Sequence, residues 1–198
     1  MSEALVGRCL DTFAQAADVH RRSGEALVEP LCRTIGLLND ALAAGHRVLI
    51  CGNGGSAAES QHFAAELTGR FRRERAALPA IALTVDTSAL TAIGNDYGFE
   101  RVFARQVDAY GRSGDVLLAI STSGRSPNVV AAAEAARMRG MTVVALTGAS
   151  SGTLGDVSDV VLAVPDADTA RVQEVQLTLL HVLCDEIERA ATTAPREP

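Results

Sequence analysis

The sequence predicts an α/β fold: a doubly wound sheet of five parallel strands with an N-terminal helical extension. Short apolar runs alternate with longer segments of helical periodicity after residue 45. These runs are continuously apolar and rich in β-branched residues or leucine, which is typical of strands covered on both faces and hence of a parallel sheet. Of the 198 residues, 47% are hydrophobic and 21% are charged, so one domain can bury a full core.

The N-terminal segment, residues 1–45, is expected to form a pair of helices that pack or oligomerise. Apolar side chains recur about one turn apart from Leu5 and Phe13 to Leu42, and Gly45 then ends the pattern. The apolar stripe of such helices must be buried against the sheet layer or against another subunit.

Residues 46–192 form the predicted sheet domain. Its helical segments include SPNVVAAAEAARMRG and a longest, last helix that starts at Thr169. Residues 193–198 are expected to be a frayed tail. The five expected strands are RVLIC at 47–51, AIALT at 80–84, DVLLAI at 115–120, TVVALT at 142–147 and DVVLAV at 159–164.

Composition argues against several classes of protein. The net charge is -6 and aromatic residues make up 4%, so neither a basic surface nor a stacking platform for nucleic acid is expected. No apolar run approaches the length of a membrane span, and MSEALVGRCLDTFAQ lacks the form of a signal peptide. We therefore expect a cytoplasmic protein without membrane or direct nucleic-acid partners. The four cysteines form no CxxC pair and are expected to be buried or half-buried free thiols.

Two polar loops are expected to meet at one crevice of the sheet. Ligands of doubly wound sheets bind beyond the carboxyl ends of the strands, where the strand order reverses. In the common order 2-1-3-4-5 this point lies between the first and third strands, which are followed by GNGGS and STSGRS. The second loop opens directly into a helix, so its hydroxyls and free N–H groups can bind an anion. A single serine there would be explained as a helix cap, but four hydroxyls favour a phosphate pocket.

The first loop also fits a different interpretation. GNGGSA matches the dinucleotide fingerprint G-x-G-x-x-A between a strand and a helix, and Asp86 ends the second strand as that fingerprint requires. A nicotinamide or flavin enzyme is therefore an alternative. A dinucleotide would not need the second phosphate loop, whereas a sugar phosphate could use it, so the sequence favours a sugar-phosphate site.

Side chains suited to acid–base chemistry lie on two of the predicted helices. His62 and Glu66 are four residues apart and share one helix face, where they could move protons, hold a divalent metal with two further ligands, or form an incidental surface contact. His181 lies on an otherwise apolar face of the last helix, with Gln173 two turns earlier. A neutral core histidine bonded to a carbonyl is the alternative for His181.

The combination of NGGS, H-x-x-x-E-L-T-G-R, STSG-x-S and Q-x7-H resembles the sugar isomerase (SIS) domain group, and within it the bacterial phosphoheptose isomerases. The resemblance covers nearly the whole chain. It implies a flavodoxin-like SIS fold and a homotetramer with active sites at subunit interfaces. It also implies an enzyme that interconverts sedoheptulose 7-phosphate and D-glycero-D-manno-heptose 7-phosphate through an enediol, towards the heptoses of bacterial lipopolysaccharide.

The resemblance also implies roles for individual residues. Glu66 matches the catalytic base and His181 the general acid or second base. One zinc ion per subunit is implied at His62, Glu66, Gln173 and His181. The implied substrate and phosphate contacts are Asn53, Gly54, Gly55, Ser56, Arg70, Asn95, Asp96, Ser121, Thr122, Ser123, Ser126 and Gln173. The chain departs from some relatives at Ala170, where they carry an aspartate close to the substrate, so the resemblance does not extend to the details of hydroxyl recognition.

Two alternatives belong to other functional classes. A replication-initiator-associating protein of the same domain group binds the initiator DnaA without catalysis, and ALPAIALTVDTSALTAI and HVLCDEIE look like parts of it. A sugar-phosphate sensor would have the same pocket and no turnover. A scaffold needs neither Glu66 nor His181, so the presence of both favours the enzyme.

Overall fold

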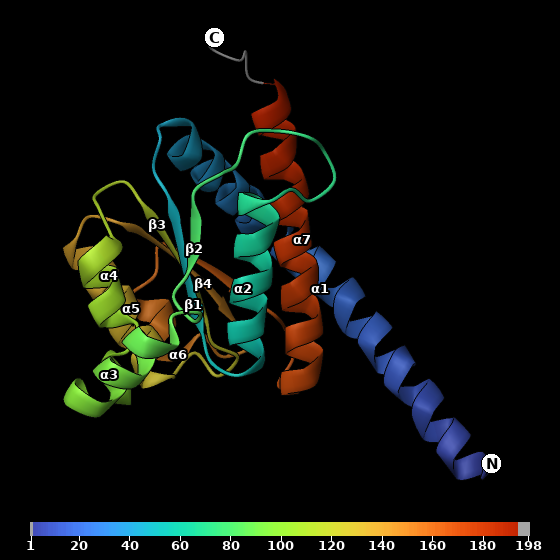
Figure 1. Ribbon diagram of the computed structural model, residues 1–198. Helices are drawn as coiled ribbons and strands as arrows, with labels where there is room; N and C mark the ends of the chain where they lie inside the picture. The colour runs from blue at the N-terminus through green and yellow to red at the C-terminus, as the bar shows by residue number, and fades with distance from the viewer. Residues whose placement is uncertain (1, 194–198) are drawn as a thin grey trace.

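The protein contains one five-stranded parallel sheet, in the order β2-β1-β3-β4-β5 (Figure 1). This computed structural model describes residues 2–193. The predicted fold is confirmed, the strands follow the common order on which the expected crevice depended, and each strand overlaps its expected range. The strands are β1 (Val48–Gly52), β2 (Ala80–Ala82), β3 (Val116–Ile120), β4 (Thr142–Thr147) and β5 (Val160–Ala163).

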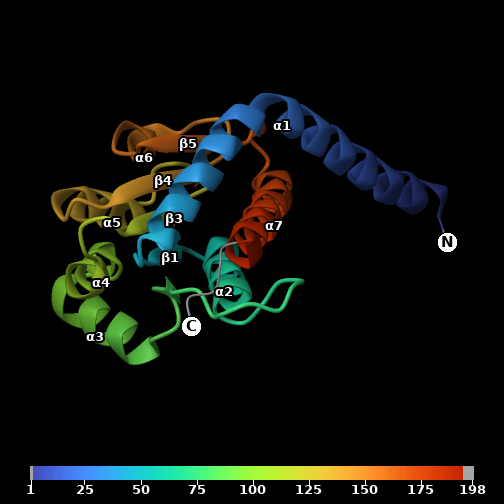
Figure 2. The ribbon, with the colours of Figure 1, turned by 90° about the horizontal axis from the view of Figure 1, so that it is seen from above.

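Two helical layers cover the sheet, as Figure 2 shows from above. A hydrophobic core lies on each face of the sheet, and alternate residues of β1 point into one or the other. Val48 and Ile50 pack with α1, α2 and α7, whereas Leu49 and Cys51 pack with α4, α5 and α6. The helices are α1 (Glu3–Ala43), α2 (Gly55–Thr68), α3 (Thr87–Tyr97), the 3-10 helix η1 (Phe99–Arg101), α4 (Ala104–Tyr110), α5 (Pro127–Met138), α6 (Gly152–Asp156) and α7 (Thr169–Thr193).

The register of the central strands determines where the polar loops lie. In the β1–β3 ladder the last residues, Gly52 and Ile120, stand opposite each other. The loops that follow them, 53–54 and 121–126, therefore start side by side at the carboxyl edge of the sheet. The expected crevice lies here.

The N-terminal segment is one helix of 41 residues, so the expected pair of helices is wrong. A proline inside a helix removes one backbone hydrogen bond, but α1 continues through Pro30 because Leu27 and Leu38, on either side of it, are buried against the domain. The N-terminal half projects away from the body (Figure 1), and there Leu10 and Phe13 are 65% and 77% exposed.

Three further expectations concern membrane spans, the cysteines and the C-terminal tail. None of the helices between residues 2 and 193 combines the length and the apolar character that a membrane span needs. All four cysteines are free, but Cys9 and Cys32 are exposed, whereas burial was expected. The expected tail, 193–198, lies outside the described residues except for Thr193, at which α7 ends.

Candidate active site

The loops after β1 and β3 enclose a pocket of about 270 Å³ at the carboxyl edge of the sheet. Two of its lining residues, Ile120 and Thr169, were not predicted from the sequence. Thr169 is the first residue of α7, and a hydroxyl at a helix start is the signal that could have found it. The predicted residues that line the pocket are Asn53, Gly54, Gly55, Ser56, Ser121, Thr122, Ser126 and Gln173.

Two helices direct their N-termini at this pocket. Helix α2 starts at Gly55 and α5 at Pro127, and neither Gly54 nor Ser126 caps its helix through a side-chain hydrogen bond. The hydroxyl of Ser126 instead lies 2.9 Å from that of Ser121. Free N–H groups, two helix dipoles and this hydroxyl pair form an environment suited to a phosphate.

A reciprocal amide pair fixes the two loops relative to each other. Asn53 donates to Asn128 over 2.8 Å, and Asn128 donates back to Asn53 over the same distance. Sequence reasoning missed Asn128, which is 2% exposed on α5 and belongs to no motif. Because each amide satisfies the other, the pair holds the pocket without consuming the serine hydroxyls.

Close packing at the start of α2 requires a glycine. A Cβ atom on Gly55 would stand 2.4 Å from Nε2 of Gln173, which lies against it from α7. The glycine therefore lets the Gln173 amide reach the pocket.

The second half of the predicted site lies where α2 and α7 run side by side. The Nε2 atoms of His62 and His181 are 2.9 Å apart, and His62 Nε2 lies 3.6 Å from Glu66 Oε1. The ring of His181 also stacks on Phe71, with centroids 5.5 Å apart. Burial lowers the pKa of His181, as does the facing His62, while Glu66 acts in the opposite direction. The imidazole is therefore favoured in its neutral form, able to donate from one nitrogen and accept at the other.

The structure brings together three of the four predicted metal ligands but not the fourth. Among residues 2–193, no group of three or more histidine, cysteine, aspartate or glutamate side chains is gathered closely enough to hold a metal ion. His62, Glu66 and His181 lie together, but Gln173 lines the phosphate pocket, whereas His181 lines a separate pocket of about 280 Å³ with Phe71, Arg72 and Asp185.

Four predicted contacts lie away from the pocket of this chain. Asn95 and Asp96 are exposed on α3, where the Asn95 amide donates to the Asp96 carboxylate. Arg70 is exposed just beyond α2, 4.0 Å from Glu74. The hydroxyl of Ser123 is 3.4 Å from that of Ser121, but Ser123 does not line the pocket.

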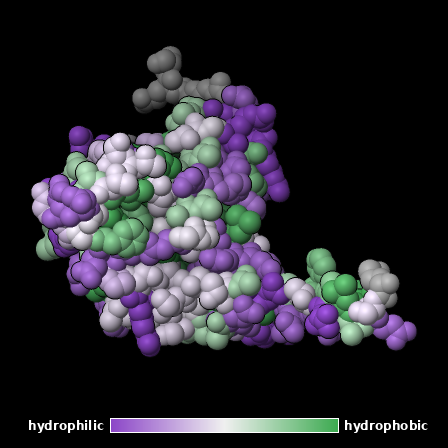
Figure 3. Space-filling model, turned by 60° about the horizontal axis from the view of Figure 1, so that its bottom comes forward, coloured by the Kyte–Doolittle hydropathy of each residue, from purple (hydrophilic) through white to green (hydrophobic). Residues whose placement is uncertain are grey.

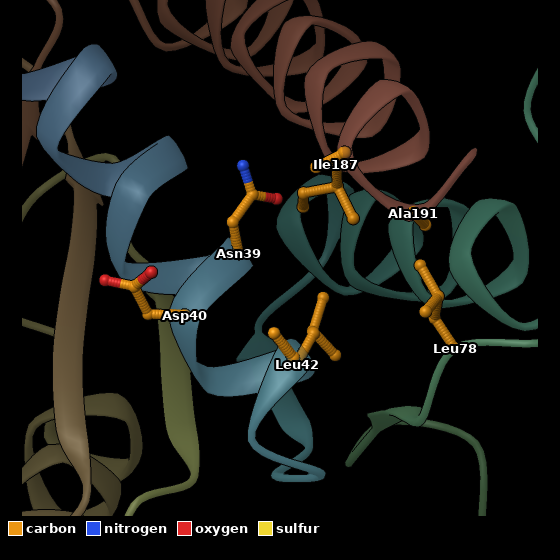
Figure 4. A pocket seen from close by; sticks show the side chains of 8 residues that line it. Asn39, Asp40, Leu42, Leu78, Ile187 and Ala191 are labelled. Carbon is orange, nitrogen blue, oxygen red and sulfur yellow. The ribbon is translucent and has the colours of Figure 1, made fainter. Parts of the chain in front are cut away.

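A third pocket, of about 300 Å³, lies between the end of α1 and the end of α7 (Figure 4). Its walls are mostly apolar, with Leu42, Leu78 and Ile187 facing one another and Asn39 and Asp40 at one side. None of the predicted site residues lines this third pocket. Because its walls are also mostly apolar, we do not assign the active site to it.

Known proteins share both the sequence and this architecture. The SIS domain family matches residues 13–148. Phosphoheptose isomerase from Bordetella avium is 54% identical over 187 residues, which cover 93% of this chain and 95% of the relative. The structure of phosphoheptose isomerase from Neisseria gonorrhoeae superposes with a TM-score of 0.89 at 48% identity, covering 93% of this chain and 99% of the other. That from Francisella tularensis gives 0.91 at 38% identity, covering 96% and 100%.

The chain belongs to the phosphoheptose isomerase family. The resemblance carried by its motifs is thereby confirmed over most of its length.

Helix α2 also carries a buried carboxyl that is not among the predicted site residues. Glu59 on α2 is only 9% exposed, and its Oε2 atom has no hydrogen-bond partner among the described residues. Burial raises the pKa of this carboxyl to about 7. Glu59, His62 and Glu66 follow one another at three and four residues, so they share one side of α2.

Proposed function

We propose that the chain is an aldose–ketose isomerase that interconverts sedoheptulose 7-phosphate and D-glycero-D-manno-heptose 7-phosphate, supplying heptose for bacterial lipopolysaccharide. One observation carries the proposal: a hydroxyl-lined pocket and an imidazole–carboxylate cluster lie along one helix, α7, at Gln173 and His181 respectively. The name that its relatives share supports the same reaction over a sensor or a DnaA-binding scaffold.

The spacing along α7 suits a seven-carbon substrate. Eight residues separate Gln173 from His181, a rise of about 12 Å at about 1.5 Å per residue. An extended seven-carbon sugar spans roughly 10 Å from its first carbon to a phosphate on its last, from standard bond lengths. A three-carbon sugar phosphate covers about half of that distance and would not reach both places.

The chemistry requires one proton to move between neighbouring carbons. We assign to Glu66 the removal of the proton from C1 of the ketose and its return to C2 of the enediol. His181 moves the second proton between the two oxygens, a task for which a neutral imidazole has both a donor and an acceptor. Anchoring the phosphate at the far end lets the binding energy orient C1 and C2 between these groups.

Zinc belongs to the proposal as a cofactor held by His62, Glu66, Gln173 and His181. The donors suit zinc in kind, and the 2.9 Å between the two imidazole nitrogens is close to the ~3.3 Å between neighbouring ligands of tetrahedral zinc. When bound there, zinc would polarise the substrate carbonyl. Gln173 lies against Gly55 in the phosphate pocket, two turns of α7 away from His181, so in the single chain it lies apart from the other three donors. Its role as a ligand rests on the resemblance alone. Because a carboxylate bound to zinc is a weak base, we assign the two roles of Glu66 to different steps.

A homotetramer is the proposed assembly. The projecting half of α1 carries exposed hydrophobic side chains, visible as green patches on the arm in Figure 3. Helix α3 has no buried residue; Tyr97 at its end and Phe99 at the start of η1 are 56% and 64% exposed. Covering these surfaces with further copies would bury apolar area and would let Asn95 and Asp96 complete the site of a neighbouring copy. A cytoplasmic location belongs to the same proposal, since a charged sugar phosphate is poorly soluble in a bilayer.

An isomerase assay on sedoheptulose 7-phosphate tests the proposal with the parent chain, Glu66→Gln and His181→Ala. Removing an acid–base group should lower kcat by about 10²- to 10⁴-fold. Both variants should still bind inorganic phosphate, because Ser121 and Ser126 are intact. His46→Ala is the matched control and should keep full activity, since His46 lies outside both pockets.

Other outcomes separate the alternatives. Binding of the sugar phosphate without turnover by the parent chain would identify a sensor. Absence of both, together with co-purification of DnaA, would identify the scaffold. Unchanged kcat in Glu66→Gln would remove Glu66 from the mechanism.

A further inference from the structure

We propose that Glu188 is a positioning residue of this isomerase, which fixes the loop formed by residues 69–75 and, through that loop, the ring of His181. Glu188 lies seven residues after His181 on α7, so the two side chains project from nearly the same side of the helix. The inference rests on the proposed function, because it concerns the placement of a proposed acid–base group.

The carboxylate of Glu188 is a buried anchor for the backbone of this loop. It has no exposed surface, and it accepts three consecutive N–H groups, from Phe71 at 2.9 Å, Arg72 at 2.8 Å and Arg73 at 2.7 Å. Burial raises the pKa of Glu188, but these three donors together with Arg75 outweigh it and hold the pKa below its usual value. The charged carboxylate can only accept hydrogen bonds, and the three backbone N–H groups can only donate them, so the two sides are complementary.

Arg75 extends the anchor to the end of α2. The side chain of Arg75 is only 2% exposed, and its Nε lies 3.6 Å from Oε1 of Glu188. The same guanidinium donates to the carbonyl oxygens of Glu66, Leu67 and Gly69 at 2.7, 2.8 and 3.0 Å. Carbonyls at a helix end lack partners within the helix; that of Leu67 also accepts from the backbone N–H of Leu78 at 3.0 Å. The Glu188–Arg75 pair thus ties α7 to the turn of α2 that carries Glu66.

The anchored loop holds an aromatic ring against His181. The backbone N–H of Phe71 binds Glu188, while its side chain stacks on the His181 imidazole with centroids 5.5 Å apart and planes at 25°. The guanidinium of Arg72 covers the Phe71 ring at 4.8 Å. His181 is thus held by His62 on one side and by Phe71 on another, and Phe71 is held in turn by Glu188.

A shift of this loop should act on the chemical step more than on substrate binding. The phosphate pocket is built from other loops and contains no residue of 69–75. Displacing a reacting group by about 1 Å can cost on the order of 100-fold in rate. The conservative change Glu188→Gln keeps one acceptor oxygen but removes the charge and places an NH₂ group against at least one of the three backbone N–H groups, so the loop should shift.

The experiment separates positioning from loss of stability. Leu38→Ala, in α1 and outside the loop, removes a fully buried side chain and serves as a control with a lowered melting temperature. In the full-length protein labelled with ¹³C-histidine, the His181 ring protons should show the shielding expected above an aromatic ring. Glu188→Gln and Phe71→Leu should both reduce this shielding, whereas Phe71→Tyr and Leu38→Ala should retain it.

Kinetics provide the second readout. Glu188→Gln and Phe71→Leu should lower kcat by about 10- to 100-fold while KM changes by less than about threefold, and Phe71→Tyr should restore kcat. Parent-like shielding and kcat in Phe71→Leu would overturn the proposal, even if Glu188→Gln does not fold. A parent chain with normal shielding but no turnover would refute the proposed function and leave the positioning of the ring supported.

Discussion

His62 and His181 meet through their Nε2 atoms at 2.9 Å, although 119 residues separate them in the chain. Two N–H groups pointed at each other would repel, so at this distance one nitrogen donates and the other accepts. The lowered pKa of His181 agrees with such a neutral ring. The pair joins α2 to α7 at one point, and its two nitrogens can be bridged by a proton or by a divalent cation.

His62→Ala should weaken zinc binding at least about tenfold, because it removes one nitrogen ligand of the proposed set. The affinity of the parent chain should also fall as the pH is lowered, since protons compete for the same imidazole nitrogens. Isothermal titration calorimetry with zinc measures both. His46→Ala should bind zinc like the parent, and equal affinities for the two variants would exclude His62 as a ligand.

Ser121→Ala should raise KM for the sugar phosphate with a smaller effect on kcat. Ser121 is 4% exposed and its hydroxyl faces that of Ser126. Loss of this hydroxyl removes one hydrogen bond to a charged phosphate, about 1.5–3 kcal/mol or roughly 10- to 100-fold in affinity. Ser158→Ala is the matched control, because the Ser158 hydroxyl donates to the Leu154 carbonyl away from the pocket. A KM equal to that of the control would place the phosphate elsewhere.

The phosphate pocket could be predicted from the sequence because its signals are local. Each loop follows a continuous apolar run, and the parallel order brings Gly52 and Ile120 together at the ends of their strands. The prediction of a pair of helices in residues 1–45 was wrong because the structure there depends on tertiary packing and not on local signals. Tertiary burial of Leu27 and Leu38 carries α1 past Pro30, and a local pattern does not report such packing.

Other parts of the site depend on contacts that leave no trace in a short motif. Asn128 matters only because Asn53 lies opposite to it across two loops. The raised pKa of Glu59 follows from burial of the whole side chain, which helical periodicity does not reveal for a polar residue. Asn95 and Asp96 are exposed in the single chain, so their predicted contact with substrate depends on a neighbouring copy.

Gly55→Ala should lower kcat/KM about as much as Gln173→Ala does, and the double variant should be no worse than either single one. The added Cβ would collide with the Gln173 amide, which is the flexible end of a side chain and can move aside at little cost in stability. A double-mutant cycle on kcat/KM, with melting temperatures, measures the effect. Additive losses would show that Gly55 acts independently of Gln173.

Glu59→Gln should stabilise the protein increasingly as the pH rises from about 5 to 8. The pKa of Glu59 is raised from 4.5 to about 7 in the folded state, so its contribution to stability is fully present below 4.5 and is lost as the pH rises through 7. The gain of the variant over the parent should therefore grow by about 2 kcal/mol between pH 5 and pH 8. Urea unfolding at both pH values measures it.

A matched control for this measurement is Glu134→Gln on the exposed side of α5, which should show no such growth. A pH-independent difference between Glu59→Gln and the parent would mean that the Glu59 carboxyl is not desolvated in solution.

The double substitution of Leu10 and Phe13 by serine should dissociate the proposed tetramer while the domain stays folded. Both side chains are mostly exposed on the projecting half of α1, so they contribute little to the single chain, yet burying each in an interface is worth about 1.5–3 kcal/mol. Sedimentation velocity at several protein concentrations should show a smaller species, with an unchanged far-UV spectrum. Asp11→Ser, on the same stretch of helix, should sediment like the parent chain.

Because the site is proposed to need a neighbouring copy, activity should fall with the loss of assembly and recover at high protein concentration. An assembly that survives the double substitution would show that the projecting helix is not the surface that holds the copies together.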